Sequence, residues 1–181
     1  MNHIYQEPQF GEDWFTYAGF YTEMVNKFSS GSKFVEVGSW KGKSASYMCV
    51  EIANSEKNIQ FTCVDHFLGS SEHQDNPDLP RLYEIFTENM KPVENYHTVL
   101  KMPSVDAAAT FEDRSLDFVF IDAAHEYENI MADITAWLPK VKVGGILSGH
   151  DYYHQPVAQA VADSNLEGFR TAYDSWIYEV K

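Results

Sequence analysis

Four ionisable side chains follow two apolar stretches in the C-terminal half of the chain. Asp122 and His125 come after the run DFVFI at 117–121, and His150 and Asp151 come after GGILSG at 144–149. If these stretches are neighbouring parallel strands, the four side chains meet at one edge of a sheet. Two carboxylates and two imidazoles can hold a divalent metal or transfer a proton near neutral pH. Each residue alone is also compatible with a helix cap or an ordinary loop position.

A glycine-containing turn follows an earlier apolar segment, at 33–37. The turn reads EVGSWKGKS over 36–44. Gly38 permits close approach of a ligand to the backbone, while Gly42 and Ser44 begin a helix whose free N–H groups can hold an anionic carboxylate. Three residues separate the glycines, whereas a phosphate-binding P-loop has four, and the G-x-G-x-x-G spacing of dinucleotide sites is absent. A phosphate site is therefore disfavoured.

An aspartate ends the next apolar segment. Asp65 follows the run FTCV at 61–64, 27 residues after Gly38. That separation fits one strand–helix–strand unit, and an acidic residue there can accept hydrogen bonds from both hydroxyls of a ribose. The alternative is a structural role as a cap or turn residue.

Four segments, in this order, resemble the class I methyltransferases that use S-adenosylmethionine (SAM), in particular the branch of sugar and antibiotic O-methyltransferases and cephalosporin-hydroxylase-like proteins. The segments are VEVGSWKGKSASYM, CVDHF, and the two joined in DFVFIDAAHEYENIMADITAWLPKVKVGGILSGHDY. The resemblance implies that Asp65 holds the ribose and that Ser104 lies near the adenine. The full set of residues expected at the cofactor is Glu36, Gly38, Ser39, Gly42, Ser44, Asp65, His66, Ser104 and Asp122.

The resemblance also implies a metal site, since related sugar O-methyltransferases hold a divalent ion with acidic residues that end the fourth and fifth strands. Asp122 and Asp151 match two of these positions, and His150 stands where another acid is expected. The expected ion is Mg²⁺ or Mn²⁺, and an imidazole ligand shifts the preference away from Mg²⁺. In the metal-free alternative, His125 or His150 is the general base and Asp122 orients it.

The implied activity is transfer of a methyl group from SAM to a small-molecule acceptor, through a hydroxyl oxygen. A protein that binds SAM without turnover is the alternative, because fold alone does not dictate function. An NAD-dependent oxidoreductase is disfavoured because it needs the missing glycine motif. No residue identifies the acceptor.

Alternating strand and helix patterns must position these residues. We expect an α/β, Rossmann-like sheet of seven strands that is mostly parallel, with helices on both faces. Two residues separate the last two strands, so they form an antiparallel hairpin. The expected strands are 33–37, 59–65, 96–101, 116–122, 144–149, 169–173 and 176–180, and the expected helices are 42–54, 79–91, 103–111, 126–140 and 154–166.

The chain is expected to form a single domain over 1–181, with a helical extension at 1–31. Aromatic residues from Trp14 to Phe28 recur every three or four positions, which predicts an amphipathic helix there. The polar segment 66–77 is either a lid over the site or a surface loop.

The composition of the chain limits the classes of binding partner and the location that we expect. With 27 acidic and 13 basic side chains, the formal net charge is -14, which opposes binding to nucleic acid. No apolar run has the length of a membrane span, and the N-terminal residues do not resemble a signal peptide, so a cytoplasmic location is expected. Cys49 and Cys63 are expected in the core. Homo-oligomer formation is left open.

Overall fold

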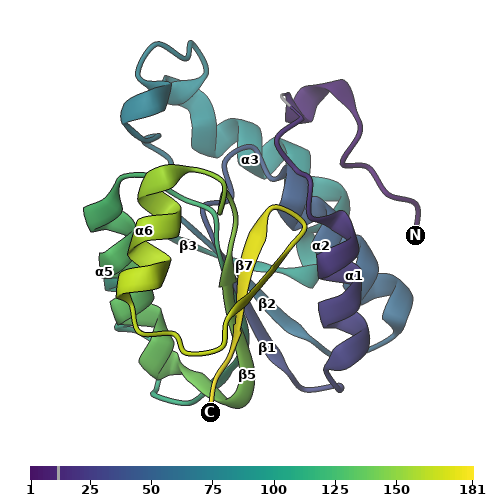
Figure 1. Cartoon of the computed structure of the whole chain (residues 1–181). Helices are drawn as coiled ribbons and strands as arrows, with labels where there is room; N and C mark the ends of the chain where they lie inside the picture. The colour runs from purple at the N-terminus through teal and green to yellow at the C-terminus, as the bar shows by residue number, and fades with distance from the viewer. Residues whose placement is uncertain (12) are drawn as a thin grey trace.

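The computed structural model describes residues 1–11 and 13–181, and it contains a seven-stranded sheet with helices on both faces (Figure 1). The strand order is β3-β2-β1-β4-β5-β7-β6. The strands are β1 (Lys33–Val37), β2 (Gln60–Asp65), β3 (Thr98–Lys101), β4 (Leu116–Ile121), β5 (Val141–Gly149), β6 (Arg170–Ala172) and β7 (Ser175–Glu179).

Strands β1 to β5 are parallel, and β7 runs antiparallel to both β5 and β6. The predicted sheet and its C-terminal hairpin are confirmed. Tyr173 and Asp174 make the hairpin turn with φ of 56° each, the left-handed conformation that two-residue hairpin loops require. β5 begins three residues earlier than predicted, because Val141 already pairs with Leu116 ahead of a register shift.

Two helical layers cover the sheet, with α1 and α2 on one side and α5 and α6 on the other in Figure 1. The helices are α1 (Ala18–Lys27), α2 (Lys43–Ser55), α3 (Leu82–Met90), α4 (Ser104–Ala108), α5 (Tyr127–Trp137) and α6 (Gln155–Asp163). Alternate residues of β1 point to opposite layers: Phe34 packs with α1, α2 and α3, and Val35 packs with α4, α5 and α6.

Short 3-10 helices complete the chain: η1 (Pro8–Phe10), η2 (Ser71–His73), η3 (Leu79–Arg81), η4 (Lys91–Tyr96) and η5 (Leu138–Lys140). Two of them replace parts of predicted α-helices. Pro80 lies in η3, just before α3, and Pro139 lies in η5, just after α5. Proline has no N–H to donate, so an α-helix begins or ends near it.

The N-terminal helix is shorter than predicted, since α1 begins only at Ala18. Trp14 and Phe15 precede it in irregular backbone, so the prediction that they belong to its apolar face is wrong. Their rings pack locally, Trp14 against Trp40 and Phe15 edge-on against Tyr17. The regular spacing of the aromatic residues therefore has two causes: some lie on one face of α1, and those before it pack in clusters of rings.

The two cysteines are free and fully buried, as predicted. Burial raises the pKa of both thiols well above its ordinary value, so neither is a reactive nucleophile. Within residues 1–11 and 13–181, no helix combines the length and apolar character that crossing a bilayer requires.

Candidate active site

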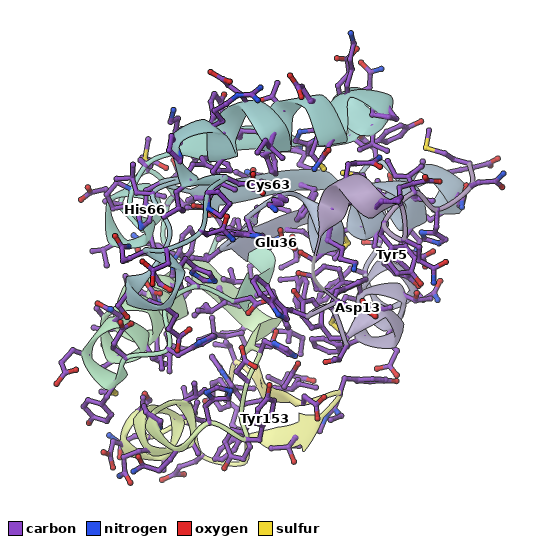
Figure 2. All side chains as sticks on the ribbon, turned by 90° about the horizontal axis from the view of Figure 1, so that it is seen from above. Tyr5, Asp13, Glu36, Cys63, His66 and Tyr153 are labelled. Atoms are coloured by element: carbon purple, nitrogen blue, oxygen red, sulfur yellow. The ribbon has the colours of Figure 1, made fainter. Side chains whose placement is uncertain are left out.

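A cavity of about 750 Å³ lies at the carboxyl ends of the five parallel strands. This size is typical of sites for small molecules and cofactors. Every strand end supplies part of the lining, namely Gly38 and Ser39 after β1, Asp65 and His66 after β2, Met102 to Val105 after β3, Asp122 to His125 after β4, and His150 and Asp151 after β5. Figure 2 shows His66 and Asp13, both of which line the cavity, towards opposite sides of the central Glu36.

Gly38, just after β1, lies directly against the backbone that follows β4. It has a φ of 89°, and a Cβ atom built on it would lie 1.9 Å from the carbonyl oxygen of Asp122. The neighbouring backbone therefore requires a glycine here, and the ligand contact expected from the sequence stays a prediction. Asp122 N donates to Val37 O at 2.8 Å, which fixes the two strand ends together.

Asp65 holds the turn after β1. Its Oδ2 accepts hydrogen bonds from the backbone N–H of Ser39 at 3.0 Å and of Trp40 at 2.9 Å, and its Oδ1 accepts from Phe67 N at 2.6 Å. Trp40 has a φ of 48°, an uncommon conformation for a non-glycine residue that these bonds stabilise. The carboxylate also lines the cavity and keeps unused acceptor positions.

Two of the predicted cofactor residues, Glu36 and Gly42, are not among the described residues that line the cavity. Glu36 is fully buried and accepts hydrogen bonds from the hydroxyls of Tyr21 and Ser39, both at 2.7 Å. Burial raises its pKa to about 7. A Cβ atom on Gly42 would lie 2.8 Å from Met90 Sδ, so this glycine permits packing against α3. Both residues support the turn.

The other predicted cofactor residues line the cavity: Gly38, Ser39, Ser44, Asp65, His66, Ser104 and Asp122. Ser104 begins α4, and its hydroxyl accepts a hydrogen bond from Trp137 Nε1 at 2.9 Å. His66 Nδ1 accepts one from Leu68 N at 2.9 Å. Lys43 and Ser44 place the N-terminus of α2 at the cavity.

The four ionisable residues singled out first do come together. His125 lies between two carboxylates, with Nε2 2.7 Å from Asp151 Oδ2 and Nδ1 2.8 Å from Glu72 Oε2. His150 is 6% exposed, with Nδ1 3.2 Å from the same Asp151 oxygen. The sequence-based hypothesis made Asp122 the partner that orients His125, but the structure gives that position to Asp151.

The segment before α1 closes this cluster. Tyr17 donates a 2.6 Å hydrogen bond to Asp122 Oδ2, and Thr16 Oγ1 lies 2.9 Å from His150 Nε2. His150 Nδ1 is 3.7 Å from Asp122 Oδ1. Both nitrogens of His150 therefore face protein partners.

The carboxylates control protonation of the histidines. The hydrogen bond to Asp151 is the main cause that raises the pKa of His125 to about 9. Burial disfavours the charged form of His150, but Asp122 and Asp151 outweigh it and raise its pKa to about 10. Burial likewise opposes ionisation of Asp151, yet hydrogen bonds from the two histidines bring its pKa well below the ordinary value. The carboxylates therefore favour the protonated form of both imidazoles.

A metal could be held by Asp122, His125 and Asp151, whose ligand atoms lie within 4.8 Å of one another. The predicted set had His150 in place of His125, whereas the ligand atoms that lie together in the structure include that of His125. Two carboxylate oxygens and one imidazole nitrogen form a donor set that favours Mn²⁺ or a later transition metal over Mg²⁺.

Sequence reasoning did not single out Tyr17, Thr16, Glu72 or Asp133, all of which line the cavity. Nothing in the local pattern distinguishes Tyr17 or Thr16, because their partners lie more than one hundred residues away. The sequence around Asp133 did contain an indication of a buried polar residue. Asp133 interrupts the apolar stripe of Ile130, Ile134 and Trp137 on α5.

The strand order and the antiparallel C-terminal strands are those of the class I methyltransferase fold. Residues 35–152 match the family described as "Methyltransferase domain", and the chain belongs to this family. Its fold is similar to that of the O-methyltransferase NovP, at 18% identity and a TM-score of 0.71, over 92% of this chain and 80% of NovP. It is also similar to the O-methyltransferase from Bacillus cereus solved in complex with SAH, at 15% identity and a TM-score of 0.64, over 94% and 83% of the two chains.

One curated relative is the uncharacterized protein y4gI of Sinorhizobium fredii. The two are 25% identical over 119 residues, which is 66% of this chain. The matched region spans only 13% of that relative's length.

Proposed function

We propose that this chain transfers the methyl group of SAM to a hydroxyl oxygen of a small molecule. The observation that carries the proposal is one continuous cavity in which the turn after β1 and Asp65 lie beside the cluster of Asp122, His125 and Asp151. The first group suits the cofactor of the family, and the second suits proton removal from an acceptor.

The chain offers a distinct group for three parts of the cofactor: the ribose, the carboxylate and the sulfonium. Asp65 presents free lone pairs to the ribose hydroxyls while its bonds to Ser39 and Trp40 hold the turn. The N-terminus of α2, at Lys43 and Ser44, has backbone N–H groups for the carboxylate of the methionine part. Asp122 and Asp151 bring negative charge to the sulfonium.

SAM supplies a methyl group activated by its positive sulfur, which leaves as the carbon–sulfur bond breaks and the carbon–oxygen bond to the acceptor forms. The chain must align the acceptor hydroxyl and take its proton. Tyr17 holds Asp122 in place at the cavity wall, and Asp151 and Glu72 hold His125. Carboxylates and an imidazole thus face the space where the acceptor hydroxyl lies.

Two routes for that proton remain as proposals. A divalent metal on Asp122, His125 and Asp151 would lower the pKa of the hydroxyl. Without a metal, His125 would accept the proton, after first giving up the one that Asp151 stabilises. The paired histidines also suit the alternative function, a SAM-binding protein without turnover, because both nitrogens of His125 and of His150 already face protein partners.

Calorimetry and a turnover assay test the proposal together. We expect SAM and SAH to bind with micromolar affinity and NAD and ATP not to bind, and we expect SAH to form when SAM is supplied with hydroxylated acceptors, catechols and sugars among them. Preferential binding of ATP or NAD would overturn the proposal. Binding of SAM without SAH formation across the acceptor panel would favour the binding protein.

A further inference from the structure

A large aromatic side chain lies half exposed at the cavity. Trp14 lines the cavity and is 51% exposed. Its ring centroid is 6.2 Å from that of Trp40 and 5.6 Å from that of His73, and these rings are inclined to it by 47° and 48°, so neither stacks flat on it. An exposed indole is typical of binding sites, because its large apolar ring is stabilised when a ligand covers it.

Three separate segments of the chain bring these rings together. Trp14 precedes α1, Trp40 lies in the turn after β1, and His73 lies in η2 of the segment 66–77. All three residues line the cavity, and the ring centroids of Trp40 and His73 are 4.4 Å apart with 32° between the planes. Trp14, Trp40 and His73 thus form an aromatic wall on which the ring of a ligand can stack.

The aromatic wall lies beside the groups proposed to take the proton of the acceptor. Glu72 directly precedes the histidine of the wall, and its carboxylate is 2.8 Å from His125 Nδ1. Thr16 lies two residues after Trp14, and its hydroxyl is 2.9 Å from His150 Nε2. Two residues of chain span at most about 7 Å, so both segments hold the wall close to the histidines. An acceptor ring stacked on the wall can therefore reach this cluster with a hydroxyl group.

The polar groups of the cavity are mostly acidic. Among the described residues that line it, Lys43 is the only lysine or arginine, and it forms a 3.0 Å ion pair with Asp13. His125 and His150, whose protonated form is favoured, already face carboxylates. An anionic acceptor would meet like charges here, which is costly. The carboxylates that line the cavity are those of Asp13, Asp65, Glu72, Asp122, Asp133 and Asp151.

We propose that the acceptor is a hydroxylated ring without a carboxylate or phosphate group, and that Trp14 binds this ring by stacking. The inference rests on the proposed function and names its substrate class. The N-terminus of α2 can hold an anion, but in the proposed function the carboxylate of the cofactor occupies it. The aromatic wall then provides affinity for the ring, and the acidic lining rejects anionic acceptors while it accepts neutral and amine-bearing ones.

Rates of SAH formation with matched acceptors test the preference for charge. One arm uses catechol, dopamine and protocatechuate, and the other uses the methyl glycosides of glucose, glucosamine and glucuronic acid. In the arm that turns over, we expect kcat/KM of the neutral and amine-bearing acceptors to exceed that of the carboxylate by at least about tenfold. Equal or faster turnover of the carboxylate would overturn the inference and leave the proposed function standing. SAH formation in neither arm would overturn both.

Trp14→Ala tests the aromatic wall with the best acceptor of the panel. We expect the KM of the acceptor to rise by about tenfold while kcat and SAM affinity change much less, because the stacked ring is lost and the reacting groups are not. Trp14→Phe keeps a ring and should recover most of this loss. Leu68→Ala is the matched control, because Leu68 is apolar and 71% exposed but is not among the described residues that line the cavity.

The kinetics of these variants decide the role of Trp14. The same acceptor KM in Trp14→Ala and Leu68→Ala, with SAH still formed, would overturn stacking on Trp14 and leave the proposed function standing. A rise in KM for Trp14→Ala that Trp14→Phe reverses would support it. Calorimetry with SAM shows whether each variant keeps the folded cofactor site, since Trp14 is half exposed and its loss should leave the core intact.

Discussion

Tyr17 and Asp122 are joined by a 2.6 Å hydrogen bond although they are 105 residues apart in the chain. Tyr17 is 1% exposed, and its ring packs against those of Phe120 and His150. The bond therefore ties the segment before α1 to the carboxylate at the end of β4. It fixes one oxygen of Asp122 and leaves the other facing His150.

Tyr17→Phe removes this bond and keeps the ring. We expect methyl transfer to slow by about tenfold, because a misplaced catalytic group loses its alignment, while affinity for SAM changes little. Steady-state kinetics that separate kcat from KM will show it. Tyr47→Phe is the control, since the Tyr47 hydroxyl contacts Thr22 and does not line the cavity. Equal turnover in the two variants would remove Tyr17 from the catalytic arrangement.

Asp65→Ala is expected to lower both stability and SAM affinity. It leaves the backbone N–H groups of Ser39, Trp40 and Phe67 without their acceptor, which should cost about 2 kcal/mol or more of unfolding free energy. Asp78→Ala breaks only a partly exposed ion pair with Lys41 and should cost less than about 1 kcal/mol. Chemical denaturation and calorimetry measure the two effects. Lost stability with unchanged SAM affinity would make Asp65 purely structural.

The buried carboxyl of Glu36 should make stability depend on pH. Its pKa is raised from 4.5 to about 7, so the folded chain binds this proton more tightly than the unfolded chain. The stabilisation is complete below pH 4.5 and is lost as the pH rises through about 7. Glu36→Gln stays neutral, so its stability relative to wild type should rise by about 2 to 3 kcal/mol between pH 5 and pH 8.

Denaturation curves at both pH values measure this difference, with the exposed Glu112→Gln as control. A flat difference between wild type and Glu36→Gln would show that Glu36 is ionised throughout this range.

Metal binding should depend on His125. We expect Mn²⁺ to bind the metal-free protein more tightly than Mg²⁺ does, and His125→Ala to weaken Mn²⁺ by at least about tenfold. His97→Ala is the control, because His97 contacts the backbone of Val93 outside the cavity lining. Turnover that resists a chelator but disappears in His125→Ala would instead identify His125 as a metal-free base.

Substitutions at Gly38 and Gly31 allow a matched test of how closely the neighbouring backbone packs against each glycine. Both have positive φ, but a Cβ atom on Gly31 meets nothing within 4 Å, whereas one on Gly38 overlaps the backbone of Asp122. Gly31→Ala should cost about 1 kcal/mol, and Gly38→Ala several times that, enough to prevent folding. Soluble yield and melting temperature distinguish them. Similar melting temperatures for both variants would contradict the close contact.

The fold and much of the site could be predicted because both depend on local pattern. Strand ends in a parallel sheet converge, so Asp65, Asp122 and Asp151 could be placed at one edge from order alone. Partners within that edge could not, because they depend on side-chain rotamers and on a distant segment. Asp151 rather than Asp122 holds His125, and Tyr17 reaches Asp122 from irregular backbone.

The contact between Gly38 and the backbone of Asp122 means that the turn after β1 and the end of β4 are held together through main-chain atoms. For a methyl donor seated on the turn as proposed, the distance to the backbone of Asp122 is thus set by peptide units, not by rotamers. Residues of the segment before α1 and of the segment 66–77 line the same cavity. Substitutions at those residues can change which acceptor fits without lengthening the path that the methyl group travels.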